Sequence, residues 1–499
     1  MIKTVTADGQ AELRAVRGLV GRSGESSPET EAAVAEIIRA VQTEGDAAVL
    51  RYTKAFDGEA AAAVALSELG REDMKKAYES LNDGLAAALV RAAENIRRYH
   101  ERQRPSGYEM ADENGSVLGQ TVRGLERVGI YVPGGRASYP STVLMNAIPA
   151  KVAGVEDIVM VTPPRALKTM RGGRSDAVEM SAAVGAPDAV DASGVAGDVD
   201  AASAVDTVAA AETEAVGTMA EVEVFGADLS VLAAAYIAGV DRVILAGGAQ
   251  AVAAMAYGTE AVPRVDKIVG PGNAYVAAAK RRLYGAVDID MVAGPSEILV
   301  IADGFADPGF VAADMLSQAE HDPSSAAVLL TTDAGLAEAA AEEIEAQLDR
   351  LGEIFDGEYA ENAATARTSI ETNGIIIVCR DEAEMVALAN EAAPEHLEIL
   401  TEDPFSVLPH IRNAGSVFLG AFTPEPVGDY FAGVNHVLPT SGTARYASPL
   451  GVYDFVKRMS YTYYSAEALA DAERDIVGIG EAEGLAAHVA SVKARGKGL

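Results

Sequence analysis

A repeated alternation of short apolar runs, glycine turns and alanine-rich stretches constrains this chain more than any other feature. It begins where the run Val128 to Val132 leads into Pro133-Gly134-Gly135 and a helical stretch, and it continues to the run Ser416 to Leu419. Alternating β and α units predict parallel sheets with right-handed crossovers, and ligands at the carboxyl ends of the strands. We therefore expect an α/β protein with two parallel-sheet regions, the second of which starts near Met291.

The expected domain boundaries follow changes in this pattern of apolar runs and glycine turns along the chain. An N-terminal segment takes residues 1–25, and the last part of the chain, 451–499, forms a C-terminal tail. The first α/β domain takes residues 26–130 and 297–450, and the second takes residues 131–296. Helical spacing dominates the chain up to about residue 104. There, His100 stands among arginines and a glutamate, and we interpret it as a solvated surface residue.

Residues from about 167 to 222 interrupt the alternation. They are mostly alanine, valine, glycine, serine, aspartate and glutamate, and they include no aromatic residue. Such a segment buries too little apolar area to offset its ordering entropy. We expect a flexible acidic surface insertion in a crossover connection of the second domain.

The composition excludes several classes of function. Of the 499 residues, 49% are hydrophobic, so the chain can bury a large core. Its formal net charge is -34, and a field of that sign repels nucleic acid and anionic membrane surfaces. We hypothesise a cytoplasmic enzyme of a salt-loving microbe, in which salt screens the repulsion between carboxylates. No signal peptide or membrane span is expected, and the single cysteine, Cys379, is interpreted as a buried strand residue.

The stretch Ser317 to Pro323 suggests a metal site. Gln318 and His321 are three residues apart, so on a helix they project from one face. An amide oxygen and an imidazole so placed can both reach a zinc ion. For this stretch alone, a helix end with a surface histidine is the more frequent outcome.

Three later stretches place a histidine near a carboxylate, in a chain with six histidines. An adjacent glutamate and histidine can remove a proton from an alcohol or activate water. Taken singly, each stretch has a structural alternative: the glutamate–histidine pair can be exposed, the aspartate can form a turn, and the histidines can lie on the surface. The three stretches contain Glu395-His396, Asp429 with His436, and Glu483 with His488.

The sequence motifs that would indicate nucleotide binding are weak. No Gly-x-Gly-x-x-Gly follows a strand, and there is no Walker A loop, although several glycine turns can admit phosphates. The residues alone therefore indicate a two-domain α/β protein, plausible as a metalloenzyme with an acid/base pair, and leave the reaction open. The alternatives are a zinc hydrolase that uses the Glu395-His396 pair without NAD, and a non-catalytic nucleotide-binding or assembly protein.

Seven short motifs, in order from about residue 20 to the C-terminus, together resemble the histidinol dehydrogenase family. They are Gly129 to Gly135, Gly247 to Ala251, Gly270 to Asn273, Ala293 to Glu297, Ser317 to His321, Pro394 to Leu397 and Gly428 to Pro439. The family oxidises L-histidinol to L-histidine in two hydride transfers to NAD via histidinal, the last step of histidine biosynthesis. The resemblance implies one zinc ion per subunit, and two Rossmann-like domains with an incomplete dinucleotide fold.

The resemblance also implies a role for each residue at a matching position. His396 would take the proton from the alcohol, and Glu395 would help to activate the water that adds to the aldehyde. The implied zinc ligands are Gln318, His321, Asp429 and His488. The implied substrate contacts are Ser296, Gln318, His321, His396, Asp429, His436, Glu483 and His488. The implied NAD contacts are Tyr131, Gln250 and Asn273.

The resemblance further implies an obligate homodimer with tail exchange. In the family the C-terminal tail crosses to the partner subunit, so Glu483 and His488 would complete the neighbour's site. The basic end of the tail, Lys493 to Lys497, on an acidic body is consistent with such a contact. The insertion at 167–222 departs from the family pattern on the NAD side. No nucleic acid or membrane partner is expected.

Overall fold

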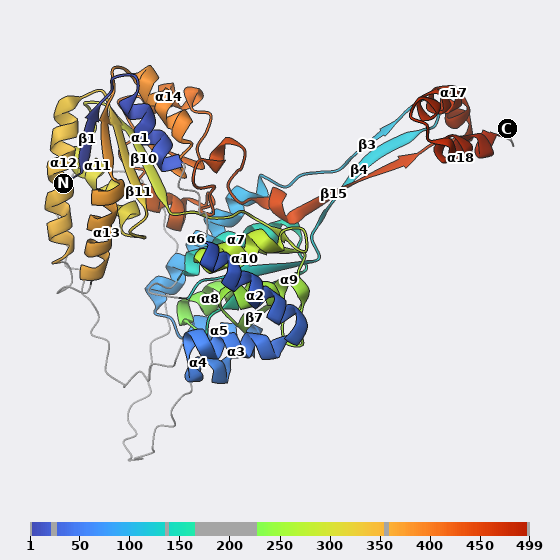
Figure 1. The fold of residues 1–499 in the computed structure, drawn as a ribbon, viewed down its shortest axis with the longest axis horizontal. Helices are drawn as coiled ribbons and strands as arrows, with labels where there is room; N and C mark the ends of the chain where they lie inside the picture. The colour runs from blue at the N-terminus through green and yellow to red at the C-terminus, as the bar shows by residue number, and fades with distance from the viewer. Residues whose placement is uncertain (1, 21–26, 135–138, 165–226, 354–358, 497–499) are drawn as a thin grey trace, which may run out of the picture. The chain divides into compact units, whose positions relative to one another are not determined.

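The structure is a computed structural model. It describes residues 2–20, 27–134, 139–164, 227–353 and 359–496, so the insertion predicted at 167–222 lies outside the described residues. The predicted α/β class with parallel sheets is confirmed, and three sheets are present in the described part (Figure 1). Among the described helices, none has both the length and the apolar character needed to cross a membrane.

The first sheet, sheet A, has six parallel strands in the order β1-β12-β11-β10-β13-β14. Because the strands are buried on both faces, alternate residues of β10 enter two different cores: Ile298 and Val300 one, Leu299 and Ile301 the other. The strands are β1 (Lys3–Thr6), β10 (Glu297–Ala302), β11 (Ala326–Thr331), β12 (Ile375–Val378), β13 (His396–Leu400) and β14 (Ser416–Leu419).

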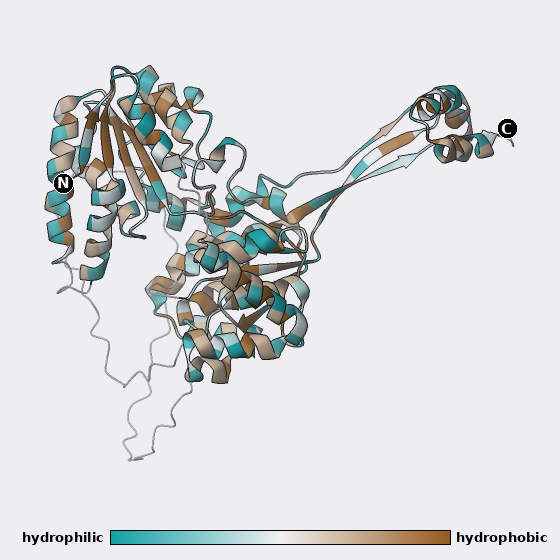
Figure 2. Cartoon of the chain, in the orientation of Figure 1, coloured by the Kyte–Doolittle hydropathy of each residue, from teal (hydrophilic) through white to brown (hydrophobic). Residues whose placement is uncertain are grey.

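Helices cover sheet A on both faces, which makes it a doubly wound unit (Figure 1). One face packs against α11 (Pro308–Ala319), α12 (Ala334–Leu351) and α13 (Ala360–Asn373). The other packs against α1 (Ala11–Val20), α14 (Glu382–Ala392) and α15 (Pro404–Val407). Figure 2 shows the strands between these layers as strongly hydrophobic.

The second sheet, sheet B, also has six strands, in the order β2-β7-β6-β5-β8-β9, and only β2 at its edge is antiparallel. One core joins the sheet to α2, α3, α9 and α10, and α5 to α8 pack on one another. The strands are β2 (Glu68–Leu69), β5 (Arg127–Tyr131), β6 (Asp157–Thr162), β7 (Arg242–Leu245), β8 (Lys267–Val269) and β9 (Asp288–Ile289). The helices are α2 (Pro28–Glu44), α3 (Asp46–Asp57), α4 (Glu59–Val64), α5 (Arg71–Glu79), α6 (Asp83–Glu101), α7 (Pro140–Ala153), α8 (Leu229–Ala238), α9 (Gly248–Tyr257) and α10 (Ala274–Leu283).

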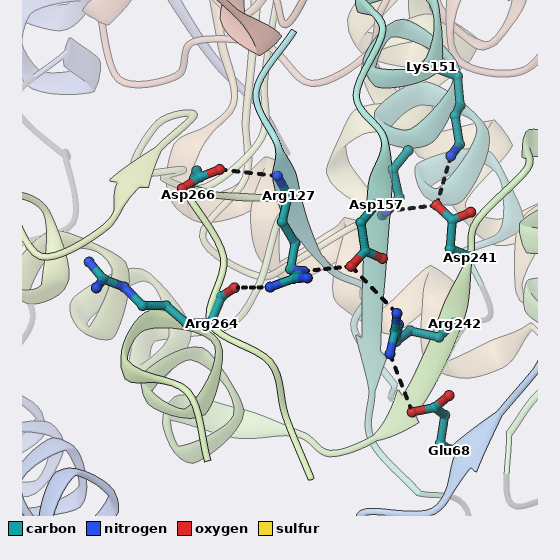
Figure 3. Close-up of polar contacts among 9 residues, drawn as sticks. Glu68, Arg127, Lys151, Asp157, Asp241, Arg242, Arg264 and Asp266 are labelled. Atoms are coloured by element: carbon teal, nitrogen blue, oxygen red, sulfur yellow. Dashed lines mark hydrogen bonds and ion pairs between the residues drawn. The ribbon is translucent and has the colours of Figure 1, made fainter. Parts of the chain in front are cut away.

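An ion-pair network ties together the amino ends of the central strands of sheet B (Figure 3). The Nε atom of Arg127 lies 2.6 Å from a carboxylate oxygen of Asp157, which also lies 3.5 Å from Arg242. Arg242 in turn lies 3.9 Å from Glu68 on the edge strand. These groups are partly exposed, so each pair contributes little alone. The network marks the edge of the sheet that faces away from the loops described below.

The third sheet, sheet C, is antiparallel and has the order β15-β4-β3. Its strands are β3 (Tyr108–Ala111), β4 (Val117–Gly124) and β15 (Val456–Tyr463), followed by α17 (Ala466–Ala482) and α18 (Ala486–Gly496). The Ser465 hydroxyl caps α17 and donates to the main-chain oxygen of Asn114 at the β3–β4 turn. Both tail helices are largely exposed, including Ile479 of α17, and so is Leu485 between them.

The strand pairing distributes the chain differently from the expected boundaries. Residues 28–57 and 68–69 pack with sheet B rather than with the domain of residues 297–450. The N-terminal segment instead supplies β1 to sheet A. Helical periodicity identifies the apolar face of a helix but not the sheet that receives it, which explains the difference. The surface interpretation of His100 was also wrong, because its side chain is fully buried.

Candidate functional site

A cavity of about 380 Å³ brings together most of the residues singled out from the sequence. From the sheet A side it is lined by Ser296, Gln318, His321, Glu395, His396, Asp429 and His436. From the sheet B side it is lined by Pro133, Gly134 and Gly270 to Asn273. The predicted acid/base pair and three of the four predicted metal ligands therefore share one cavity.

The position of this cavity corrects one sequence expectation. On sheet B the lining loops follow β5 and β8, at the carboxyl ends of the strands, as predicted. On sheet A most lining residues precede β10 and β11 or begin β13, at the amino ends, and Asp429 and His436 come from the long segment after β14. The rule of carboxyl-end binding applies to a sheet that binds its ligand alone. Here the ligand side of sheet A is set by the neighbouring sheet.

The pair Glu395 and His396 is buried at the start of β13 and is held by Glu297. The Nδ1 atom of His396 lies 3.0 Å from the main-chain oxygen of Glu297, so Nδ1 carries the hydrogen. The main-chain N–H of Glu297 donates to Glu395 Oε2 at 2.9 Å. Burial lowers the pKa of His396 to about 3 and raises the pKa of Glu395 well above its usual range. His396 is therefore a neutral imidazole with its lone pair on Nε2.

Gln318 and His321 lie at the end of α11. Gln318 is in the last helical turn and 1% exposed, and its Oε1 atom is buried with no hydrogen-bond partner among the described residues. His321 lies just beyond the helix, not on it as predicted, and is exposed at the cavity. A buried amide oxygen without a partner is costly unless a ligand or ion satisfies it.

Asp429 and His436 come from one segment, residues 428–438, which we call the site loop. The Nδ1 atom of His436 lies 3.7 Å from a carboxylate oxygen of Asp429. Burial raises the pKa of Asp429 to about 6 and lowers the pKa of His436 to about 4. The loop starts with a π-helical turn, Gly428–Ala432, of a kind often found at functional sites.

Two buried glutamates behind the site loop were missed from the sequence. The Oε1 atom of Glu425 lies 3.7 Å from Nε2 of His396, and its carboxyl group hydrogen-bonds Asp429. Burial, followed by the charge of Asp429, raises the pKa of Glu425 to about 9. Glu398 accepts the main-chain N–H of Glu425 at 2.8 Å. A glutamate between two prolines, as at Pro424-Glu425-Pro426, was the available signal, because rigid backbone on both sides indicates a fixed side chain.

The donor set fits a divalent cation. His396, Glu425 and Asp429 offer ligand atoms within 4.8 Å of one another. The unpaired oxygen of Gln318 faces the same cavity, as does His321. Because protonated Glu425 donates to Asp429, it is better placed to orient Asp429 than to bind the ion itself. Nitrogen and oxygen donors of this kind suit zinc.

A second cavity of about 300 Å³ shares Gly134 and Asn273 with the first. It contains the three predicted NAD contacts, Tyr131, Gln250 and Asn273, beside the amino end of α9. Gln250 Oε1 is buried without a hydrogen-bond partner in the described residues, so a polar group of a ligand would satisfy it. The main-chain N–H groups at a helix start favour phosphate groups, so the cavity fits a dinucleotide.

The loop between the two cavities is fixed by a buried ion pair. Lys280 hydrogen-bonds both the main-chain oxygen of Gly270 and the carboxylate of Asp290. Asp290 also accepts the main-chain N–H of Gly270 at 2.8 Å. Gly270 has φ +107°, and a Cβ atom there would lie 2.2 Å from the main-chain oxygen of Tyr131. Only glycine lets the two loops approach so closely.

The structure does not bring Glu483 and His488 into this site. Neither residue lines the cavity, and both side chains are exposed on the tail helices. The histidine at the cavity mouth, His321, is exposed as well.

Fold and site together define a class of α/β enzymes built on two parallel sheets, with a buried glutamate–histidine pair beside donors that fit a cation and a second cavity that fits a dinucleotide. The family model for histidinol dehydrogenase matches residues 20–197 and 202–496. The chain belongs to the histidinol dehydrogenase family.

Individual relatives support this membership. Histidinol dehydrogenase of Syntrophotalea carbinolica is 46% identical over 496 residues, with 99% of each chain covered. That of Geobacter sulfurreducens is 46% identical over 477 residues, with 96% of each chain covered. A solved structure of the enzyme from Elizabethkingia anophelis has a TM-score of 0.79 and 31% identity, and the match covers 100% of this chain and 98% of that one.

Proposed function

We propose that this enzyme oxidises L-histidinol to L-histidine in two successive hydride transfers to NAD, through histidinal, with the help of one zinc ion per subunit. The observation that carries the proposal is a pair of neighbouring cavities, which share the lining residues Gly134 and Asn273. One holds Glu395 and His396 beside the unpaired oxygen of Gln318, and the other holds Tyr131, Gln250 and Asn273. Membership of the family favours this reaction over hydrolysis.

His396 is the base in both oxidation steps. Its Nδ1–H is committed to the main-chain oxygen of Glu297, so Nε2 is the atom that takes the proton of the substrate hydroxyl. The same hydrogen bond stabilises the imidazolium that results, since a carbonyl oxygen accepts from it in either state. Ser296 and His436 line the same cavity, and we propose that they contact the substrate.

Glu395 activates the water that adds to the aldehyde. Its Oε2 atom is fixed by the main-chain N–H of Glu297, so the carboxylate has one orientation in the cavity. Because burial raises the pKa of Glu395, its ionised form accepts a proton more readily than an exposed glutamate does. The two neighbours thus divide the proton transfers between them.

Gln318, His321 and Asp429 would hold the zinc ion, with Glu425 orienting Asp429. Bound zinc would orient the substrate and lower the pKa of its hydroxyl group. NAD would lie in the second cavity, with its phosphates near the start of α9.

The tail supports a site shared between two copies of the chain. We propose that His488 of one subunit supplies the fourth zinc ligand of its neighbour, and that Glu483 contacts the substrate there. The exposed apolar side chains of the tail, including Ile476, Ile479 and Leu485, are consistent with burial against a second copy. An exposed His321 at the cavity mouth leaves room for such a ligand to approach.

An assay with L-histidinol and NAD tests the proposal. We expect two molecules of reduced NAD for each histidine formed, activity lost on treatment with a zinc chelator, and activity restored by added zinc. Product formation without reduction of NAD would favour a zinc hydrolase. A purified chain that neither binds zinc nor reduces NAD with this substrate would exclude the proposed reaction.

A further inference from the structure

The mechanism above leaves one buried histidine without a role. His100 lies at the end of α6 and is fully buried, although its neighbours in sequence are charged. Helix α6 packs with the helices of sheet B. Its other partners belong to the site loop, residues 428–438, which lies against the helix.

Both ring nitrogens of His100 are engaged. Nδ1 lies 2.8 Å from Gln103 Oε1, an atom that can only accept, so Nδ1 carries the hydrogen. Nε2 lies 3.3 Å from Nδ2 of Asn435 and accepts from it. Burial lowers the pKa of His100, which keeps the ring neutral and Nε2 free to accept. Gln103 also accepts the main-chain N–H of Val452 at 3.0 Å.

Both the amide nitrogen and the amide oxygen of the Asn435 side chain have hydrogen-bond partners. Its amide nitrogen also donates to the main-chain oxygen of Met145 at 2.7 Å, and its amide oxygen accepts the N–H of Val437 at 2.9 Å. The residue is 3% exposed and directly precedes His436, which lines the cavity. One side chain therefore ties the site loop to α6 and to α7.

Two further contacts attach the same loop to α6. The Nδ2 atom of Asn95 donates to the main-chain oxygen of Phe431 at 2.8 Å. Gly433 has φ +99°, and a Cβ atom there would lie 2.5 Å from the main-chain oxygen of Asn95. The loop backbone thus lies directly against the helix, and its position depends on this packing.

We propose that His100 is a positioning residue that holds Asn435, and thereby the site loop, in its working place. Through this loop it sets the position of the proposed zinc ligand Asp429 and of the substrate contact His436. Helix α6 on the sheet B side is thereby linked to the cation site on the sheet A side. The inference rests on the proposed function for the roles of those two residues.

Two substitutions at position 100 separate the two hydrogen bonds of the imidazole. His100→Gln places an amide near the Nε2 position, so it can still accept from Asn435. His100→Asn places an amide near Nδ1, so it keeps Gln103 and loses Asn435. Leu89→Ala, at a buried position of the same helix away from the loop, serves as the control for general destabilisation.

Zinc affinity is measured by competition with a chromogenic chelator, and KM and kcat for L-histidinol are measured separately. We expect His100→Asn to weaken zinc binding and raise KM by about tenfold each, as for one lost hydrogen bond, while His100→Gln stays close to wild type. Leu89→Ala should lower the melting temperature and leave both constants unchanged. Asn435→Ala removes the same hydrogen bond, between Asn435 and His100, from the loop side. Its effect should therefore not add to that of His100→Asn.

The inference is overturned if His100→Asn and Asn435→Ala lower only the melting temperature, as the control does. It is also overturned if His100→Gln and His100→Asn weaken zinc binding equally. The zinc measurement needs no turnover. If wild type bound zinc but did not oxidise L-histidinol, the proposed function would fail while the positioning role could still be read from zinc affinity.

Discussion

The imidazole of His396 and the main chain of Glu297 are joined by a hydrogen bond of 3.0 Å between Nδ1 and the carbonyl oxygen. The Nε2 atom of the same ring is buried and has no hydrogen-bond partner among the described residues. One nitrogen therefore fixes the ring, and the other is left for chemistry in the cavity. The pairing of β10 with β13 sets this arrangement, because Ile298 and His396 are register partners.

Replacing His396 with asparagine should remove the base and keep the anchor. The asparagine amide can still donate near the position of Nδ1, but nothing replaces Nε2. We expect kcat to fall by about 10² to 10⁴ with zinc content unchanged. The control is His410→Asn, at an exposed histidine outside the cavity, which should keep full turnover. An active His396→Asn enzyme would remove His396 from its role.

Replacing Gln318 with an apolar residue should weaken metal binding without lowering the stability of the metal-free protein. Gln318→Leu removes a buried oxygen that has no partner, so the metal-free protein should melt at the same or a higher temperature. Because the oxygen is a proposed zinc ligand, zinc affinity should fall by at least about tenfold. Thermal melts with a chelator and zinc titrations test the two effects separately. Unchanged zinc affinity would show that Gln318 is not a ligand.

The buried carboxyl of Glu398 should make stability depend on pH. Burial, followed by the charge of Asp314, raises the pKa of Glu398 to about 10. Above about pH 4.5 the unfolded chain loses this proton and the folded chain keeps it, so the contribution to stability falls as pH rises towards 10. Glu398→Gln cannot titrate and still accepts the N–H of Glu425.

Urea unfolding at several pH values measures this effect. Between about pH 5 and 8, we expect the mutant to gain stability relative to wild type as pH increases. Parallel pH profiles for the two proteins would mean that Glu398 titrates normally in the folded state. Glu398→Leu is the matched control, since it removes the titrating carboxyl and the acceptor together and should be less stable than Glu398→Gln at every pH.

The net charge of -34 should make the enzyme depend on salt. The Debye length falls from about 10 Å in 0.1 M salt to about 3 Å in 1 M salt, so repulsion between surface carboxylates is screened. We expect both activity and melting temperature to rise between dilute buffer and molar KCl. Sucrose at equal osmolality, which screens no charge, is the control. Activity that is highest in dilute buffer and falls in molar KCl would contradict the salt-loving hypothesis.

Much of the sheet architecture could be predicted from local pattern. The apolar runs Val128 to Val132 and Ser416 to Leu419 were recognised from the sequence, and the structure places β5 and β14 there. Which sheet a helix joins could not be predicted, because the partner of an apolar face is distant in sequence. Helix α2 illustrates this, since its Val34 and Ile37 pack with sheet B and not with the domain expected.

The candidate site was predicted where short motifs carried it, and missed where burial decided it. Gln318, Asp429 and His436 stood in recognisable motifs, and the structure places all three in the cavity. His100 was misread because its charged neighbours face solvent while its own side chain faces inward. Glu425 was missed because its local signal, the two flanking prolines, indicates a fixed backbone and not the burial of the side chain.

A hybrid dimer tests the shared zinc site most directly. One subunit carries His396→Asn and the other carries His488→Asn, and two different affinity tags allow the hybrid to be purified alone. If each site combines the body of one subunit with the tail of its neighbour, one site of the hybrid has both defects and the other has none. We therefore expect each parent homodimer to be nearly inactive and the hybrid to have about half of the wild-type activity. An inactive hybrid would contradict the exchange of tails, because a site built within one chain leaves one defect in each site.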